Sequence, residues 1–143
     1  MTTRDAMNTA VAAAITQVAR ALPDSGTSHL DDGQGGAFVI IDTLDLGPAF
    51  TPRITWVGFA IPPLYPRADV YPHYVRPDLA KTDGSILTVP LNPGQMMPGF
   101  NRPATMVSRR SNRWDPARDT AVLKLHRVLL WFRQQATPDR IAA

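Results

Sequence analysis

The fold of this chain is decided by residues 53–66, RITWVGFAIPPLYP. Over residues 53–61 the side chains alternate between two faces, with Trp56 on one and Val57 and Phe59 on the other. Both faces are largely apolar, which predicts a strand that is covered on both sides. The prolines that follow end this strand, because proline lacks the backbone N–H that a sheet ladder requires.

A helix and another strand precede this segment. Apolar residues recur at steps of three and four over residues 6–22, which predicts an amphipathic helix that ends at the turn Pro23–Gly26. After a glycine-rich joint, the β-branched and aromatic run Ala37–Ile41 is typical of a buried strand.

Prolines are dense from Pro62 onward. They predict one short strand within Asp69–Val75 and a long ordered loop that continues to about Ser111. Helical spacing returns over residues 121–132, where a second helix is predicted.

Polar residues at both ends bound the second helix. Asp115 or Asp119 is expected to cap its start, and Thr137-Pro138 is expected to end it. The order of elements is helix, antiparallel strands, long proline-rich loop, helix, which predicts an α+β fold. At 143 residues, we expect a single domain, 1–143.

Composition excludes several classes of protein. With 44% hydrophobic and 19% charged residues, the chain is typical of a folded globular protein rather than a disordered one. It contains no cysteine, which excludes disulfides, thiolate zinc ligands and a thiolate nucleophile. No apolar run is long enough to cross a bilayer and no secretory signal opens the chain, so we expect a cytoplasmic protein without membrane contact.

Arginines crowd one stretch of the chain near its C-terminal end. Their guanidinium groups suit phosphate, but no interleaved aromatic residues or nucleic-acid motif accompany them. We therefore favour a solvated loop or a patch for an acidic protein partner, and we do not expect nucleic acid. The arginines are Arg102, Arg109, Arg110, Arg113 and Arg118.

Four short motifs follow one another along the chain. They are Tyr65-Pro66, Arg76-Pro77-Asp78, Gly84-Ser85-Ile86-Leu87 and Trp114-Asp115-Pro116. Their order and spacing resemble the ubiquitin-conjugating enzyme family, where a Tyr-Pro turn, His-Pro-Asn, Gly-x-Ile-Cys and Trp-x-Pro occur in this order. The resemblance implies a UBC-like fold with an N-terminal helix, a short antiparallel β-meander, a long proline-rich loop and a C-terminal helix.

Two departures from the family pattern bear on activity. Leu87 stands where the resemblance places the cysteine that carries ubiquitin as a thioester, and leucine cannot form one. Asp78 stands where an asparagine is thought to support the oxyanion, and would place a negative charge there. Both departures imply a pseudoenzyme rather than an enzyme, with no catalytic residue.

Two groups within the wider family fit these departures. Cysteine-less conjugating-enzyme variants are similar around Gly84–Pro90, and bacterial conjugating-enzyme-like proteins are similar over Val107–Pro116 and at Asp119. The bacterial proteins are typically encoded beside an activating enzyme, a ubiquitin-like protein and a peptidase, often in phage-defence loci. We expect a non-catalytic subunit of such a modification system, which binds a ubiquitin-like protein, an activating enzyme or another conjugating subunit.

The contact surfaces implied by the resemblance are the N-terminal helix and the loop from Leu87 to Phe100, whose methionines repack easily or anchor the loop itself. We expect no cofactor and no small-molecule substrate. The three histidines have no metal-ligand spacing, so no metal site is predicted. The candidate binding residues are Tyr65, Pro66, Arg76, Asp78, Leu87, Met96, Met97, Arg109, Arg110 and Trp114.

Two alternative functions stay open. Ser85, Thr88 or Ser108 would accept an acyl group as an ester if a base activated the hydroxyl, and His73 is the nearest candidate base in the sequence. A loop hydroxyl that bonds its own backbone is far more common. The second alternative is a basic nucleic-acid-binding accessory domain that uses the arginines at 109, 110 and 113.

Overall fold

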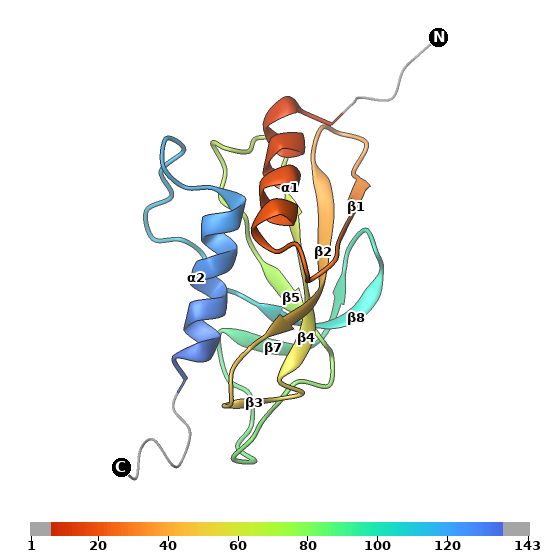
Figure 1. Cartoon of the computed structure of the whole chain (residues 1–143). Coiled ribbons are helices and arrows are strands. Elements are labelled where there is room, and N and C mark those ends of the chain that lie inside the picture. The colour runs from red at the N-terminus through yellow and green to blue at the C-terminus, as the bar shows by residue number, and fades with distance from the viewer. Residues whose placement is uncertain (1–6, 136–143) are drawn as a thin grey trace.

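Two helices and an antiparallel six-stranded sheet make up most of the computed structural model, which describes residues 7–135 (Figure 1). The strands lie in the order β1-β2-β4-β5-β8-β7, and a separate two-stranded sheet pairs β3 with β6. The elements are α1 (Thr9–Ala21), β1 (Thr27–Asp31), β2 (Ala37–Asp45), β3 (Phe50–Thr51), β4 (Ile54–Ile61), β5 (His73–Val75), β6 (Ala80–Lys81), β7 (Leu91–Met97), β8 (Arg102–Val107) and α2 (Ala121–Arg133).

The main core lies between the helices and one face of the sheet. Strand β4 contributes Val57, Phe59 and Ile61, which are at most 1% exposed. They pack with the apolar stripes of α1 and α2 in one continuous cluster. Hydrophobic periodicity therefore predicted both helices and this strand correctly, because burial of one face is what holds each element in place.

The opposite face of β4 is covered by a smaller cluster. Met97, at the end of β7, is fully buried and lies against Gly58 with Ile40. A Cβ at position 58 would collide with the Met97 sulfur, so any larger residue there would force the buried Met97 side chain to shift. The prediction that β4 is covered on both sides is correct for its centre, whereas Ile54 at its start is 49% exposed.

A hairpin replaces much of the predicted proline-rich loop. Strands β7 and β8 pair with each other, and β8 also pairs with β5, so the prediction of loop through Ser111 is wrong for this part. Pro93 lies at a register shift of the edge strand β7, and Pro103 lies beyond the part of β8 that pairs with β5. Neither proline removes a donor from a central ladder, which is why the sheet accepts both.

The start of α2 differs from the expectation. Thr120 is the N-cap, and its side chain accepts a hydrogen bond from the backbone N–H of Leu123. Asp119 does not cap the helix, because its carboxylate is held by the backbone of Asp115 and by Arg127. The predicted end at Thr137-Pro138 lies outside the described residues. Within residues 7–135, neither helix has the length and apolar character needed to span a bilayer.

Candidate functional site

The Tyr65-Pro66 turn ties the sheet to the start of α2. The Tyr65 hydroxyl accepts a hydrogen bond from the backbone N–H of Ala121 at 3.0 Å, and Trp114 Nε1 donates to the Pro66 carbonyl at 2.7 Å. Tyr65 is only 7% exposed. In this structure these residues hold neighbouring segments together, and Tyr65 offers little surface to a partner.

Arg76 and Asp78 bind each other. The guanidinium donates two hydrogen bonds, of 2.9 and 2.8 Å, to the two carboxylate oxygens. These bonds hold the pKa of Asp78 below its usual range, although the pair is exposed. An exposed pair of this kind contributes little to stability. The two charged groups already bind each other, so neither is left without a partner.

The loop 82–90 carries the segment where the resemblance places the missing cysteine. Ser85 Oγ donates to Asp83 at 2.6 Å, and the backbone N–H of Ser85 donates to the same carboxylate oxygen at 2.9 Å. These bonds lower the pKa of Asp83, so its carboxylate is a weak base near neutral pH. Thr88 is exposed in the same loop.

Two apolar side chains project from this loop while a third points inward. Leu87 is partly buried and packs against the main core. By contrast, Ile86 is 77% exposed and Val89 is 91% exposed. The loop therefore offers solvent an apolar surface and no activated nucleophile.

His73 cannot serve as the base for these hydroxyls. Its ring is fully buried on β5 beside Phe59, with ring centroids 5.1 Å apart, and neither ring nitrogen has a hydrogen-bond partner. Burial lowers the pKa of His73 to about 3, and the nearby Lys124 acts in the same direction. The neutral ring is part of the core.

The two methionines that were expected to form a binding surface lie on opposite sides of β7. Met96 is 57% exposed, whereas Met97 is fully buried against Gly58 and is not available to a partner. The physical reason is strand alternation, since neighbouring residues of β7 point to opposite sides. Ser108 is partly buried and its backbone N–H bonds the carbonyl of Pro90.

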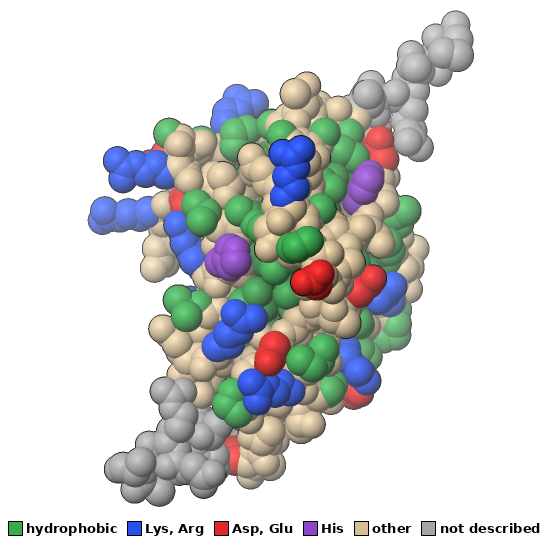
Figure 2. All heavy atoms as spheres, viewed as in Figure 1, with side chains coloured by type: hydrophobic (Ala, Val, Ile, Leu, Met, Phe, Trp, Pro, Cys, Tyr) green, Lys and Arg blue, Asp and Glu red, His purple; other side chains and the backbone are tan. Residues whose placement is uncertain are grey.

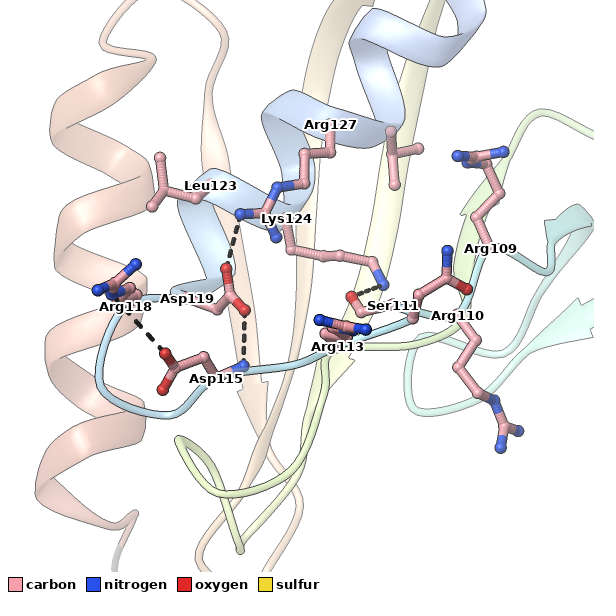
Figure 3. Close-up of a pocket in the computed structure, with 12 residues that line it drawn as sticks. Arg109, Arg110, Ser111, Arg113, Asp115, Arg118, Asp119, Leu123, Lys124 and Arg127 are labelled. Atoms are coloured by element: carbon pink, nitrogen blue, oxygen red, sulfur yellow. Dashed lines mark hydrogen bonds and ion pairs between the residues drawn. The ribbon is translucent and has the colours of Figure 1, made fainter.

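A pocket of about 690 Å³ lies between residues 109–119 and α2 (Figure 3). Half of its lining side chains are cationic, and Figure 2 shows several blue side chains on the side of the molecule that carries α2, with others spread over the rest of this face. The lining cations are Arg109, Arg110, Arg113, Arg118, Lys124 and Arg127.

Carboxylates partner only some of these cations. Arg127 binds Asp119 at 2.6 Å, and Arg118 lies 3.8 Å from Asp115 in a more exposed pair. Among the described residues, no carboxylate within ion-pair distance was found for the arginines at 109, 110 and 113. The pocket therefore carries an excess of positive charge.

Aromatic rings support two of the unpaired arginines. The guanidinium of Arg109 lies 5.2 Å from the ring centre of Trp131, and that of Arg110 lies 4.6 Å from the ring centre of Tyr71. Such cation–π contacts orient a guanidinium without neutralising it. Figure 3 shows Arg110 pointing away from α2.

Three side chains fix one end of residues 109–119, which we call the arginine-bearing segment. Lys124 reaches from α2 to Ser111 Oγ at 2.7 Å (Figure 3). It also donates to both oxygens of Asp69, at 3.1 and 3.0 Å. The backbone N–H and the hydroxyl of Ser111 donate to the same carboxylate. Burial lowers the pKa of Lys124, and Asp69 opposes that shift. Because the Ser111 hydroxyl donates its proton to Asp69 and Lys124 donates to that hydroxyl, we interpret this arrangement as an anchor and not as a serine–lysine nucleophile.

This anchor was not predicted from the sequence. Its three residues are far apart along the chain, and the only local signal is a lysine at position 124 on the inward face of an apolar helix. A buried lysine requires a partner. No group of three or more potential metal ligands occurs among residues 7–135.

No known protein family, curated protein or solved structure matches this chain. Its function is therefore inferred from the geometry above.

Proposed function

We propose that this chain is a non-catalytic, UBC-like subunit of a bacterial ubiquitin-like modification system of the kind found in phage-defence loci. It binds a ubiquitin-like protein, an activating enzyme or another conjugating subunit. One observation carries the proposal: the loop that replaces the family's nucleophile presents Ile86 and Val89 to solvent and directs Leu87 inward.

The order of elements supports a UBC-like fold. Helix α1 precedes the meander β1-β2-β4-β5, whose neighbouring strands are antiparallel. The Tyr65-Pro66 turn joins β4 to β5, and Arg76-Pro77-Asp78 follows β5 directly. These are the places where the family has its Tyr-Pro turn and its His-Pro-Asn motif.

The chemistry of the loop supports binding rather than acyl transfer. The chain has no cysteine, and Ser85 is engaged with a carboxylate whose pKa is lowered. Burying an exposed aliphatic side chain such as Ile86 or Val89 in an interface is worth roughly 1.5–3 kcal/mol before the costs of association. We therefore expect a protein partner to contact this loop.

The test uses the full chain with the activating enzyme and the ubiquitin-like protein that the proposal expects to be encoded beside its gene. After incubation with ATP, intact mass should show no covalent gain, while calorimetry detects binding to one of the two proteins. The double variant Ile86→Ser/Val89→Ser should weaken that binding. A matched control is Leu64→Ser, because Leu64 is also exposed, at 59%, but lies outside the loop.

A covalent gain equal to the modifier would overturn the proposal if it disappeared in Ser85→Ala/Thr88→Ala or in Ser108→Ala. It would instead identify an ester-forming enzyme. Charging of the activating enzyme must be shown in the same reaction, so that the absence of a gain is informative.

A further inference from the structure

We propose that the pocket between residues 109–119 and α2 binds the oligophosphate chain of a small molecule, from a nucleoside triphosphate or from inorganic polyphosphate. This site is independent of the exposed loop 82–90. At about 690 Å³, the pocket is within the size range of small-molecule sites.

Charge is the first argument for an anion. Arg109 and Arg113 line the pocket, and no carboxylate partner within the described chain was found for either. Like charges held around one concavity raise its potential and attract a counter-ion. The guanidinium group offers a planar fork of donors that matches phosphate oxygens. A chain of several phosphate groups is therefore a better match for these arginines than one small anion.

Rigidity is the second argument. One end of the arginine-bearing segment is held by Ser111, which hydrogen-bonds Asp69 and Lys124. Its other end is held by Asp119, which accepts from the backbone of Asp115 and from Arg127. The stretch between these two anchors loses little conformational entropy when a ligand binds, so Arg113 is pre-organised, and Arg109, which precedes Ser111, is oriented by the ring of Trp131.

The surroundings favour a compact ligand over a nucleic-acid strand. The rings of Trp131 and Tyr71 are covered by Arg109 and Arg110, which leaves those faces unavailable for base stacking. Asp115 also lines the pocket and would repel a phosphate backbone that continued past it. A short phosphate chain, unlike a continuous strand, does not have to extend past that carboxylate.

Calorimetry of the full chain with tripolyphosphate, ATP and GTP tests the proposal. The double variant Arg109→Gln/Arg113→Gln should lose about tenfold or more in affinity, because it removes two groups that donate charge-assisted hydrogen bonds. The control Arg20→Gln/Arg67→Gln makes the same charge change at two exposed arginines outside the pocket and should retain binding. Trp131 fluorescence should change on titration, because Arg109 lies over its ring.

The probes separate the possible ligands. Equal affinity for tripolyphosphate and both nucleotides identifies the phosphate chain as the recognised group, and tighter binding of one nucleotide shows that its base is also read. The proposal is overturned if none binds at millimolar concentration, or if the control loses as much affinity as the pocket variant. Tighter binding of oligothymidylate or polyglutamate would also overturn it, in favour of a nucleic acid or an acidic protein.

Discussion

Lys124 Nζ lies 3.0 Å from Asp69 Oδ2, and this ion pair joins α2 to the segment that precedes β5. The lysine side chain is 3% exposed and the aspartate side chain 16% exposed. Two segments separated along the sequence are thus held by one charged contact, which also fixes Ser111 and the arginine-bearing segment.

Replacement of Lys124 by methionine should destabilise the protein. It leaves the Asp69 carboxylate partly buried without its cation, so we expect the free energy of unfolding to fall by about 2–3 kcal/mol. Chemical denaturation measures this loss. Lys124→Met/Asp69→Leu should recover part of it, because no unpaired charge remains. A single variant as stable as the original protein would show that the pair is not an anchor.

Acid should weaken the fold through His73 before the carboxylates titrate. Because burial lowers the folded-state pKa of His73 from 6.5 to about 3, the unfolded state binds a proton first as pH falls. The neutral ring's contribution is complete above pH 6.5 and is lost between pH 6.5 and about 3. The slope should approach about 1.4 kcal/mol per pH unit.

Denaturation at several pH values between 7 and about 5, above the range where carboxylates titrate, measures that slope. His73→Leu should remove most of it. His126→Gln, at an exposed position on α2, is the matched control and should keep it. A slope that persists in His73→Leu would assign the acid sensitivity to another group.

Gly58→Ala should displace the end of the β7–β8 hairpin. The added Cβ meets the buried Met97 side chain, and overpacking of this kind costs about 1–3 kcal/mol. Met97→Ala removes the obstacle but leaves a cavity. In the double variant the two losses should therefore be less than additive, as measured by a double-mutant cycle of unfolding free energies. Strict additivity would mean that the two residues do not conflict.

Thr120→Ala should cost about 1 kcal/mol of unfolding free energy, because it removes the side-chain acceptor at the start of α2. Thr120→Ser keeps the hydroxyl and should be close to the original protein. Thermal unfolding of the two variants measures the difference. If alanine and serine behave alike, the cap contributes nothing.

Ile86→Ser/Val89→Ser should leave stability within about 0.5 kcal/mol, because both side chains already face solvent. Leu87→Ser should cost more, since Leu87 packs against the core. Denaturation curves of the two variants test this contrast. A large loss in the double variant would assign the loop a structural role and weaken its interpretation as a docking surface.

Local patterns explain which elements could be predicted. The core stripe of α2 and the alternation in β4 are periodic over enough residues to specify both the element and its buried face. The sequence did not predict the hairpin of β7 and β8. Whether a proline disrupts a strand depends on its place among the hydrogen-bonded pairs of the sheet, and the sequence does not show that place. Pro93 lies at a register shift of the edge strand, and Pro103 lies in the part of β8 that pairs with β7 and not with β5, so neither removes a donor from the pairing of β8 with β5.

Periodicity and residue type act locally, so they were enough to predict the α+β class, the two helices, the strand β4 and the absence of thiol chemistry. The contact of Lys124 with Asp69 and the burial of His73 appear only in the folded chain. The same holds for the arginines that line one pocket with α2. These depend on contacts between distant segments, whose distances and desolvation are set by how the helices pack on the sheet.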